Sequence, residues 1–161
     1  MGLAIHFVLG GTWLMGLGRD VGEVNPDDAW NVLKDDEFAR LIDVRTRAEW
    51  GFVGVPDLTE LGQTPILIEW ASYPDMSVNP AFAAKVEEAI GSENPETLLF
   101  ICRSGARSLQ AAMAVTEYFA QAGKEVTCLN VAEGFEGDLD ASGHRGRQNG
   151  WKARGLAWRQ S

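Results

Sequence analysis

Histidine and cysteine are scarce in this sequence of 161 residues, which contains two of each. The histidines, His6 and His144, lie far apart, and no Cys/His cluster has the spacing of metal ligands. Two cysteines, Cys102 and Cys128, do not make a disulfide framework, and no Asn-x-Ser/Thr sequon is present. The sequence therefore predicts no metal and no cofactor, and it favours the reducing environment of the cytoplasm.

Positive charge is also in the minority. The chain has 14 Lys and Arg against 23 Asp and Glu, a formal net charge of −9 at pH 7. This balance argues against a nucleic-acid partner. The length and the 45% hydrophobic content suit one globular domain with a sizeable core. Against this acidic background, a local group of arginines indicates an anionic substrate.

Charged side chains are absent from residues 2–18 (GLAIHFVLGGTWLMGLG). This stretch lacks the basic region and cleavage site of a signal peptide, and it is short and glycine-rich beside the ~20 residues of a spanning helix. Three interpretations of residues 1–23 stay open: a poorly ordered extension, an export signal or membrane anchor, and a segment packed on the domain. Membrane contact is expected only through residues 2–18. The domain itself is expected over residues 24–161.

The rest of the chain alternates between strand and helix patterns. Short apolar runs predict strands over residues 39–44, 66–68, 97–101 and 126–131. Capping residues and apolar positions with a 3.6-residue period predict helices that begin near Asn25, Thr46, Asn79 and Ser108. This order predicts an α/β domain with a central parallel sheet and helices on both faces. The tail from Glu133 onward is expected to wrap the domain as irregular structure.

Two polar residues follow predicted strands. Asp43 ends the first and Cys102 follows the third, and because parallel strands present their carboxyl ends at one edge, we expect both residues there. Two roles for Asp43 stay open. It caps the following turn, or it pairs with Arg103 or Arg107 and so supports the loop.

The segment 102–108 (CRSGARS) is the strongest candidate for a reactive site. It joins a strand to a helix, where backbone N–H groups converge on an anion, and its two arginines further favour the thiolate of Cys102. Such a thiolate attacks an electron-poor sulfur to give a persulfide, and a thiolate or cyanide then removes the outer sulfur. This scheme needs neither a metal nor a general base. Cys128, within a predicted strand, is interpreted as a core residue.

Three further polar residues are weaker candidates. Arg45 and Arg47 are expected to be solvated or bonded within their turn. His144 stands in a Gly- and Arg-rich loop, so it is a weak candidate for a ligand or a base.

These motifs resemble the rhodanese domain family. Residues 41–50 (LIDVRTRAEW) are similar to its first-strand motif, residues 102–108 to its active-site loop, and residues 130–135 (NVAEGF) to the stretch after its fourth strand. The match covers roughly residues 24–137, and the segment 149–158 (NGWKARGLAW) also fits.

The resemblance implies a rhodanese-like α/β fold. It also implies a sulfurtransferase that moves a sulfane sulfur from thiosulfate or a similar small anionic donor to a thiol, cyanide or protein acceptor. Cys102 would carry the persulfide, and the substrate would be bound by Arg103, Ser104, Gly105, Ala106, Arg107 and Ser108.

Two departures and two alternatives accompany this resemblance. The stretch 51–57 (GFVGVPD) replaces the family's Gly-His-Ile-Pro-Gly-Ala, and the insertion 58–77 is long and aromatic, which indicates an unusual acceptor. Related phosphatases and arsenate reductases use a wider Cys-x5-Arg loop, so the Cys-x4-Arg spacing here favours a single sulfur over phosphate. A persulfide carrier or regulatory sulfur-binding domain that acts with a protein partner is the alternative.

Overall fold

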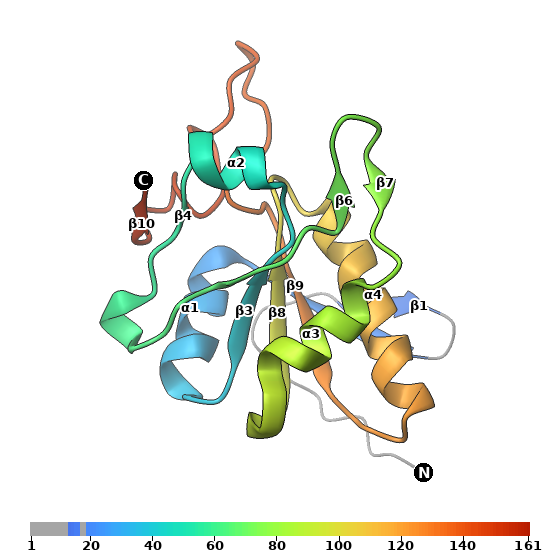
Figure 1. Cartoon of the computed structure of the whole chain (residues 1–161). Helices are drawn as coiled ribbons and strands as arrows, with labels where there is room; N and C mark the ends of the chain where they lie inside the picture. The colour runs from blue at the N-terminus through green and yellow to red at the C-terminus, as the bar shows by residue number, and fades with distance from the viewer. Residues whose placement is uncertain (1–12, 17–18) are drawn as a thin grey trace.

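A six-stranded sheet forms the centre of the computed structural model, which describes residues 13–16 and 19–161 (Figure 1). Its strand order is β1-β2-β9-β8-β3-β5. These strands are β1 (Trp13–Gly16), β2 (Arg19–Val24), β9 (Thr127–Val131), β8 (Thr97–Ile101), β3 (Arg40–Asp43) and β5 (Ile66–Leu67). Strands β2, β9, β8, β3 and β5 are parallel, and β1 is antiparallel to β2. The predicted parallel sheet is confirmed.

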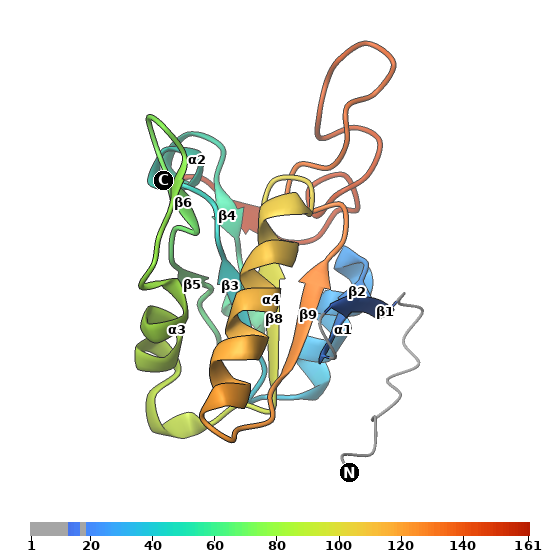
Figure 2. The same cartoon turned by 90° about the vertical axis from the view of Figure 1, so that its right-hand side faces the viewer.

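Helices cover both faces of this sheet, as predicted (Figure 2). The helices are α1 (Pro26–Asp35), α2 (Arg47–Phe52), α3 (Phe82–Ile90) and α4 (Ala106–Gln121). Helices α3 and α4 pack on one face, α1 packs on the other, and α2 lies at the edge where β3 and β8 end. The connections include the pairs β4 (Val55–Pro56) with β10 (Trp158–Arg159) and β6 (Ala71–Ser72) with β7 (Ser77–Val78), and 3-10 turns at Thr59–Leu61 and Gly91–Glu93.

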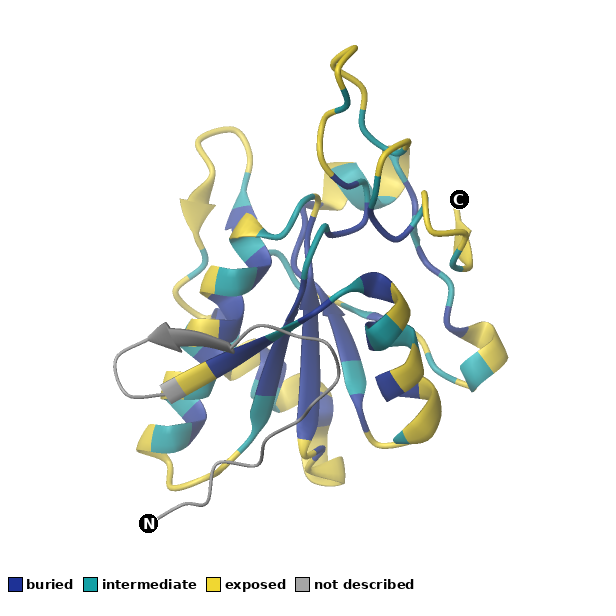
Figure 3. Cartoon of the chain, turned by 180° about the vertical axis from the view of Figure 1, so that it is seen from behind, coloured by how far each residue is buried: buried dark blue, intermediate teal, exposed yellow. Residues whose placement is uncertain are grey.

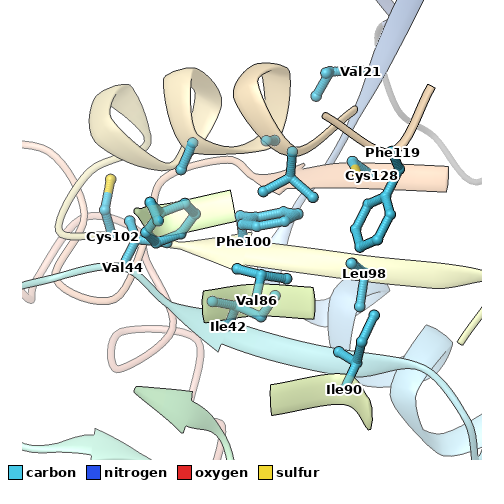
Figure 4. Close-up of a cluster of buried hydrophobic side chains, with 14 residues drawn as sticks. Val21, Ile42, Val44, Val86, Ile90, Leu98, Phe100, Cys102, Phe119 and Cys128 are labelled. Carbon is cyan, nitrogen blue, oxygen red and sulfur yellow. The ribbon is translucent and has the colours of Figure 1, made fainter. Parts of the chain in front are cut away.

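Strand β8 runs through the middle of the core, and all five of its residues are buried. Alternate side chains point to opposite faces of a strand. Leu98 and Phe100 therefore join the cluster under α3 and α4, whereas Leu99 and Ile101 join the cluster under α1. Figure 3 shows the central strands as the buried part of the fold. Cys102 lies at the end of the first cluster, where β8 leaves the sheet (Figure 4).

Two helix starts follow directly from the sequence. The Asn25 side chain accepts a hydrogen bond from the Asp28 N–H at 2.8 Å, and Pro26 opens α1. Thr46 and Glu49 form a reciprocal capping box at α2. The two later starts differ slightly from the prediction. Helix α3 begins at Phe82, after a turn, and α4 begins at Ala106 directly after the cysteine loop.

The N-terminal part of the sheet was not predicted. Strand β2 pairs with β9 through residues 22–24, so the sheet includes residues upstream of Val24. Its sequence, RDVGEV, mixes charges with a glycine and gives no apolar run. The possible signal or anchor in residues 2–18 lies, apart from β1, outside the described residues. Within the described ranges, no helix is both long enough and apolar enough to cross a membrane.

The C-terminal tail packs back onto the domain. The Trp151 side chain is fully buried against the α1 face, and its indole N–H donates to the Ala157 carbonyl at 2.8 Å. It meets Trp30 edge to face at a ring-centre distance of 6.0 Å. Arg154 binds Glu133 at 2.6 Å and Asp27 at 2.7 Å. These contacts hold the tail against α1 and against the stretch that follows β9.

Candidate active site

Asp43 and Cys102 lie at the same edge of the sheet, as predicted. Strands β3 and β8 are adjacent and parallel, and Asp43 is in register with Ile101, the residue before Cys102. The loop between β8 and α4 therefore stands beside the loop between β3 and α2 (Figure 1). This edge is where open α/β sheets place their sites.

The sulfur of Cys102 lies inside a short turn. Its Sγ is 3.1 Å from the Gly105 nitrogen, which donates to it, and 3.1 Å from the Ser108 hydroxyl oxygen. Gly105 has φ = +110°, a conformation that favours glycine, and it immediately precedes α4. The turn therefore brings the first residues of a helix around the sulfur.

The loop amides are available to an anion. The N–H groups of five loop residues have no hydrogen-bond partner among the described residues, and only that of Gly105 donates to the sulfur. The first N–H groups of a helix have no partner within it. These five are the N–H groups of Arg103, Ser104, Ala106, Arg107 and Ser108. The arrangement is a cradle of donors beside a thiol, suited to negative charge.

The stretch after β9 holds this loop in place through backbone hydrogen bonds. The Phe135 N–H donates to the Cys102 carbonyl at 2.8 Å, and the Glu136 and Gly137 N–H groups donate to the Arg103 carbonyl at 3.0 and 3.2 Å. These bonds satisfy the two carbonyls at the start of the loop. They therefore tie the cysteine loop to the segment 130–135, which the sequence had singled out for its NVAEGF motif.

Gly134 makes this close approach of two backbones possible. Its φ is +69°, and a Cβ atom built on it would lie 2.5 Å from the Arg103 carbonyl group and 2.6 Å from the Cys102 oxygen. A side chain does not fit at that distance. The glycine of the NVAEGF motif therefore allows the backbone of the stretch after β9 to lie directly against the backbone of Cys102 and Arg103.

Arg107 is held by Glu49 of α2. The Arg107 Nη1 and Nη2 atoms donate to the two carboxylate oxygens at 2.7 and 2.9 Å. The hydrogen bond that Arg107 donates to Glu49 raises the pKa of Arg107, and burial opposes this effect without cancelling it. Burial would also raise the pKa of Glu49, but hydrogen bonds and charge from Arg107, with hydrogen bonds from Thr46, lower it below its usual value. The pair is thus ionised, and it joins the first turn of α4 to α2.

The sequence pointed to Glu49 only as a capping residue. Its Oε1 accepts from the Thr46 N–H, and the Glu49 N–H donates to the Thr46 hydroxyl oxygen, which together form the capping box. The same Oε1 also accepts from the Thr46 hydroxyl and from Arg107. One carboxylate thus caps α2 and anchors the cysteine loop. The capping signature accounted fully for this glutamate, so its second role gave no separate signal.

The prediction that Asp43 pairs with Arg103 or Arg107 is wrong. Its two oxygens instead accept from the Arg45 Nε at 2.9 Å and Nη2 at 2.6 Å. The other interpretation of Asp43, as a cap of the following turn, is confirmed, since its Oδ1 also accepts from the Arg45 N–H at 3.2 Å.

Of the two expectations for Arg45, bonding within its turn is confirmed by these bonds to Asp43. Solvation is wrong, because both side chains of this pair are completely buried. The Arg45 guanidinium also donates to the Gly54 carbonyl at 2.8 Å and lies over the Phe135 ring at 4.3 Å. It thereby connects the first-strand motif with the residue that supports Cys102.

The remaining candidates are exposed. Arg103 faces solvent, and its guanidinium has no partner in the part of the chain that the structure describes. Arg47 is exposed as expected. His144 is exposed in the tail, where its ring is 4.0 Å from the Asp140 carboxylate. Arg103 therefore contributes the unpaired positive charge of the loop.

Asn130 belongs to the site although the sequence did not indicate a role for it. Its Oδ1 is 2.6 Å from the Ser108 hydroxyl, and its Nδ2 donates to the Gly105 carbonyl at 3.1 Å. It lies in β9 and is 2% exposed. The residue thus contacts both ends of the turn that surrounds the sulfur.

Cys128 is a core residue, as predicted. It is buried in the cluster under α4. This burial raises the pKa of its thiol to about 12, and a hydrogen bond involving Thr116 opposes that rise only in part. Cys102 and Cys128 are both 1% exposed, so it is not exposure that separates them. They differ in the groups around the sulfur, because Cys102 has two donors and a set of free amides beside it.

A pocket of about 460 Å³ lies between α2, the β6–β7 hairpin and the start of α3. Its wall includes Glu69, whose carboxylate accepts from the Arg47 N–H at 2.9 Å, and two cations. The insertion 58–77, in which an unusual acceptor site was expected, supplies several of its residues. The lining residues are Arg47, Trp50, Leu67, Ile68, Glu69, Ser72, Ser77, Val78, Asn79, Pro80 and Lys85.

Comparisons with known proteins agree with this architecture. No family model matches the sequence. The uncharacterized protein RC0915 of Rickettsia conorii is 33% identical over 130 residues, which cover 81% of this chain and 90% of the relative. The crystal structure of Rv0390 from M. tuberculosis aligns with a TM-score of 0.74 and 45% identity, and the match covers 86% of this chain and 97% of that one.

A third match extends to a protein with a described activity. The polysulfide-sulfur transferase homodimer of Wolinella succinogenes aligns with a TM-score of 0.52 and 20% identity, over 86% of this chain and 78% of that one. At this identity the likeness concerns the fold. The two solved structures therefore share the overall fold of this chain.

Proposed function

Because the chain belongs to the rhodanese-like domain family, we propose that it is a sulfurtransferase that carries a persulfide on Cys102. The observation that carries this proposal is the surroundings of the sulfur. Its Sγ has the Gly105 N–H and the Ser108 hydroxyl at 3.1 Å, within a loop of unpartnered amides. These donors favour negative charge at the sulfur itself and directly outside it.

The first half-reaction with thiosulfate needs no proton transfer. The Cys102 thiolate attacks the outer sulfur of thiosulfate, the new S–S bond forms, and the bond to the sulfonate group breaks. Sulfite leaves with the electron pair, and the negative charge of the thiolate moves to the outer sulfur of the persulfide. The loop amides then bind that charge as an oxyanion hole binds an alkoxide.

The second half-reaction returns the thiolate. Cyanide or an organic thiolate attacks the outer sulfur, the S–S bond of the persulfide breaks, and Cys102 keeps the electron pair. The exposed Arg103 attracts a small anionic donor or acceptor to the loop. Arg107 contributes less, because Glu49 neutralises much of its charge.

A persulfide carrier that passes its sulfur to a protein partner is the second candidate. The exposed apolar side chains near the carboxyl edge favour it. Phe52 of α2 is 85% exposed, and Tyr73 and Val78 of the β6–β7 hairpin are 60% and 52% exposed. Exposed apolar side chains are common at the contact surfaces of protein partners.

Thiocyanate release from thiosulfate and cyanide tests the enzyme directly. The wild-type chain and Cys128→Ser are expected to turn over, and Cys102→Ser is expected to be inactive. Turnover that survives in Cys102→Ser contradicts the proposal. A persulfide that forms on Cys102 but reacts with neither cyanide nor small thiols favours the carrier over the enzyme.

A further inference from the structure

We propose that Asn130 is a positioning residue for the persulfide. Its Oδ1 accepts the hydrogen bond of the Ser108 hydroxyl when negative charge leaves the Cys102 sulfur. This inference rests on the proposed sulfur transfer at Cys102. Ser108 and Asn130 together are called the hydroxyl switch below. Neither residue needs to change its backbone position for the switch to work.

The Ser108 hydroxyl stands between two acceptors. Its oxygen is 3.1 Å from the Cys102 Sγ and 2.6 Å from the Asn130 Oδ1. A hydroxyl group carries one proton and donates to one acceptor at a time. The side chains of Ser108 and Asn130 are 0% and 2% exposed, so bulk water does not supply the missing donor.

The amide of Asn130 has a fixed orientation. Its Nδ2 donates to the Gly105 carbonyl at 3.1 Å, which turns the Oδ1 toward Ser108. Gly105 itself donates its N–H to the sulfur at 3.1 Å. Asn130 is therefore anchored to the same turn that holds Cys102, and only the direction of the Ser108 proton is free to change.

The position of the charge decides that direction. When Cys102 is a thiolate, the Ser108 hydroxyl donates to the sulfur, because hydrogen bonds to charged acceptors are the stronger ones. The Asn130 Oδ1 then has no donor in a buried site, which is costly. The thiolate state therefore has one unsatisfied group.

The persulfide removes this conflict. As the thiolate attacks the donor's sulfane sulfur and sulfite leaves with the electron pair, the charge moves to the outer sulfur. The Cys102 Sγ, now bonded to two atoms and uncharged, is a weak acceptor. The Ser108 hydroxyl turns to the Asn130 Oδ1 at 2.6 Å. The free amides of the loop bind the outer sulfur, and the Asn130 Oδ1 is no longer left without a donor.

The charged groups around the site do not reverse this preference. Arg107 from α4 interacts with the charge of Cys102, with its partner Glu49 from α2, and with Tyr73 from the β6–β7 hairpin. Arg103 lies in the loop itself. These groups are present in both the thiolate and the persulfide state. The Ser108 hydroxyl, in contrast, contacts only the inner sulfur, so its proton responds to which sulfur carries the charge.

Asn130→Ala gives the decisive comparison because its two expected effects have opposite signs. Without the competing acceptor, the Ser108 hydroxyl donates to the thiolate alone, so iodoacetamide is expected to alkylate Cys102 about threefold faster at neutral pH. The fraction of persulfide at equilibrium with thiosulfate and sulfite is expected to fall about tenfold, the effect of one hydrogen bond. Intact mass measures both quantities.

Two further variants show whether the effects are specific to the contact between Asn130 and Ser108. Ser108→Ala removes the donor itself and is expected to slow alkylation. Thr116→Val, at the hydroxyl that interacts with Cys128, is the matched control and is expected to change neither quantity. Denaturant unfolding checks that each variant is folded.

The outcomes separate this inference from the proposed function. A slower alkylation together with less persulfide in folded Asn130→Ala means that Asn130 only supports the loop, and the switch is overturned. Unchanged values in that variant overturn it too. If the wild-type chain forms no persulfide, the proposed function fails and the switch fails with it. Faster alkylation with less persulfide supports the switch.

Discussion

Arg107 and Glu49 join α4 to α2 through two parallel hydrogen bonds of 2.7 and 2.9 Å. The arginine that the sequence singled out as a substrate ligand thus has a partner within the fold. Its guanidinium still lies at the cysteine loop, but a carboxylate offsets its charge there. The attraction of an anionic donor therefore depends on the loop amides and Arg103 more than on Arg107.

Removing the charge of Glu49 is expected to strengthen the binding of an anionic donor. In Glu49→Gln, Arg107 keeps a hydrogen-bond partner and gains net positive charge, so KM for thiosulfate is expected to fall about threefold or more, with little change in kcat. Steady-state kinetics measure the effect, and Glu60→Gln on the 3-10 turn Thr59–Leu61 is the control. A higher KM instead means that the ion pair positions the loop for the donor.

The same pair makes stability depend on pH in the acid range. The pKa of Glu49 is below its usual value of 4.5 in the folded chain, because the bonds and charge from Arg107 and the bonds from Thr46 outweigh the opposing effect of burial. Its contribution to the free energy of unfolding is therefore present above pH 4.5 and is lost as the pH falls through the lowered value.

Urea unfolding of the wild type and Glu49→Gln across this range measures the contribution. The stability difference between them is expected to be constant near neutral pH and to shrink below pH 4.5. A difference that grows on acidification contradicts the direction of this pKa shift.

Asp43 and Arg45 are expected to depend on each other for stability. Both side chains are fully buried, so Asp43→Asn leaves the Arg45 charge without its counter-ion and is expected to lower the free energy of unfolding by ~3–5 kcal/mol. Adding Arg45→Met is expected to restore part of the loss, because an apolar side chain needs no partner there. Asp20→Asn, at an exposed position of β2, is the control.

Gly134 is expected to tolerate no side chain. Gly62 has the same φ of +69° but nothing within 4 Å of its ideal Cβ position, which makes Gly62→Ala a matched control. That control is expected to cost ~1–2 kcal/mol for the backbone conformation alone. Gly134→Ala adds the collision with the Cys102 and Arg103 backbone, so it is expected to be less stable than Gly62→Ala and to lose sulfur transfer. Equal stability and full activity contradict the supporting role.

The elements that the sequence predicted well have strong local signals. Strands β3, β8 and β9 are short apolar runs, and they are buried because sheets covered on both faces exclude water. Helices α1 and α2 carry side-chain caps that are visible in the sequence. Strand β2 has neither signal, because it is held by its pairing with β9, which is distant in the sequence.

The sequence predicted where Cys102 lies in the fold but not the side-chain pairs that surround its loop. Cys102 could be found because a strand, a thiol and two arginines stand together in the sequence. The partner of Arg107 could not, because the folded arrangement of side chains decides it. Asp43 and Arg45 meet two residues apart, whereas Arg107 and Glu49 are separated by 58 positions. Asn130 begins the NVAEGF motif, which gave this residue no role of its own, and only its contact with Ser108 reveals one.

Intact mass after incubation with thiosulfate is the most direct test of sulfur transfer at Cys102. The wild-type chain and Cys128→Ser are expected to gain the mass of one sulfur atom, and cyanide is expected to remove it. Cys102→Ser is expected to gain nothing. A wild-type chain that acquires no sulfur, or a gain that persists in Cys102→Ser, would contradict the account.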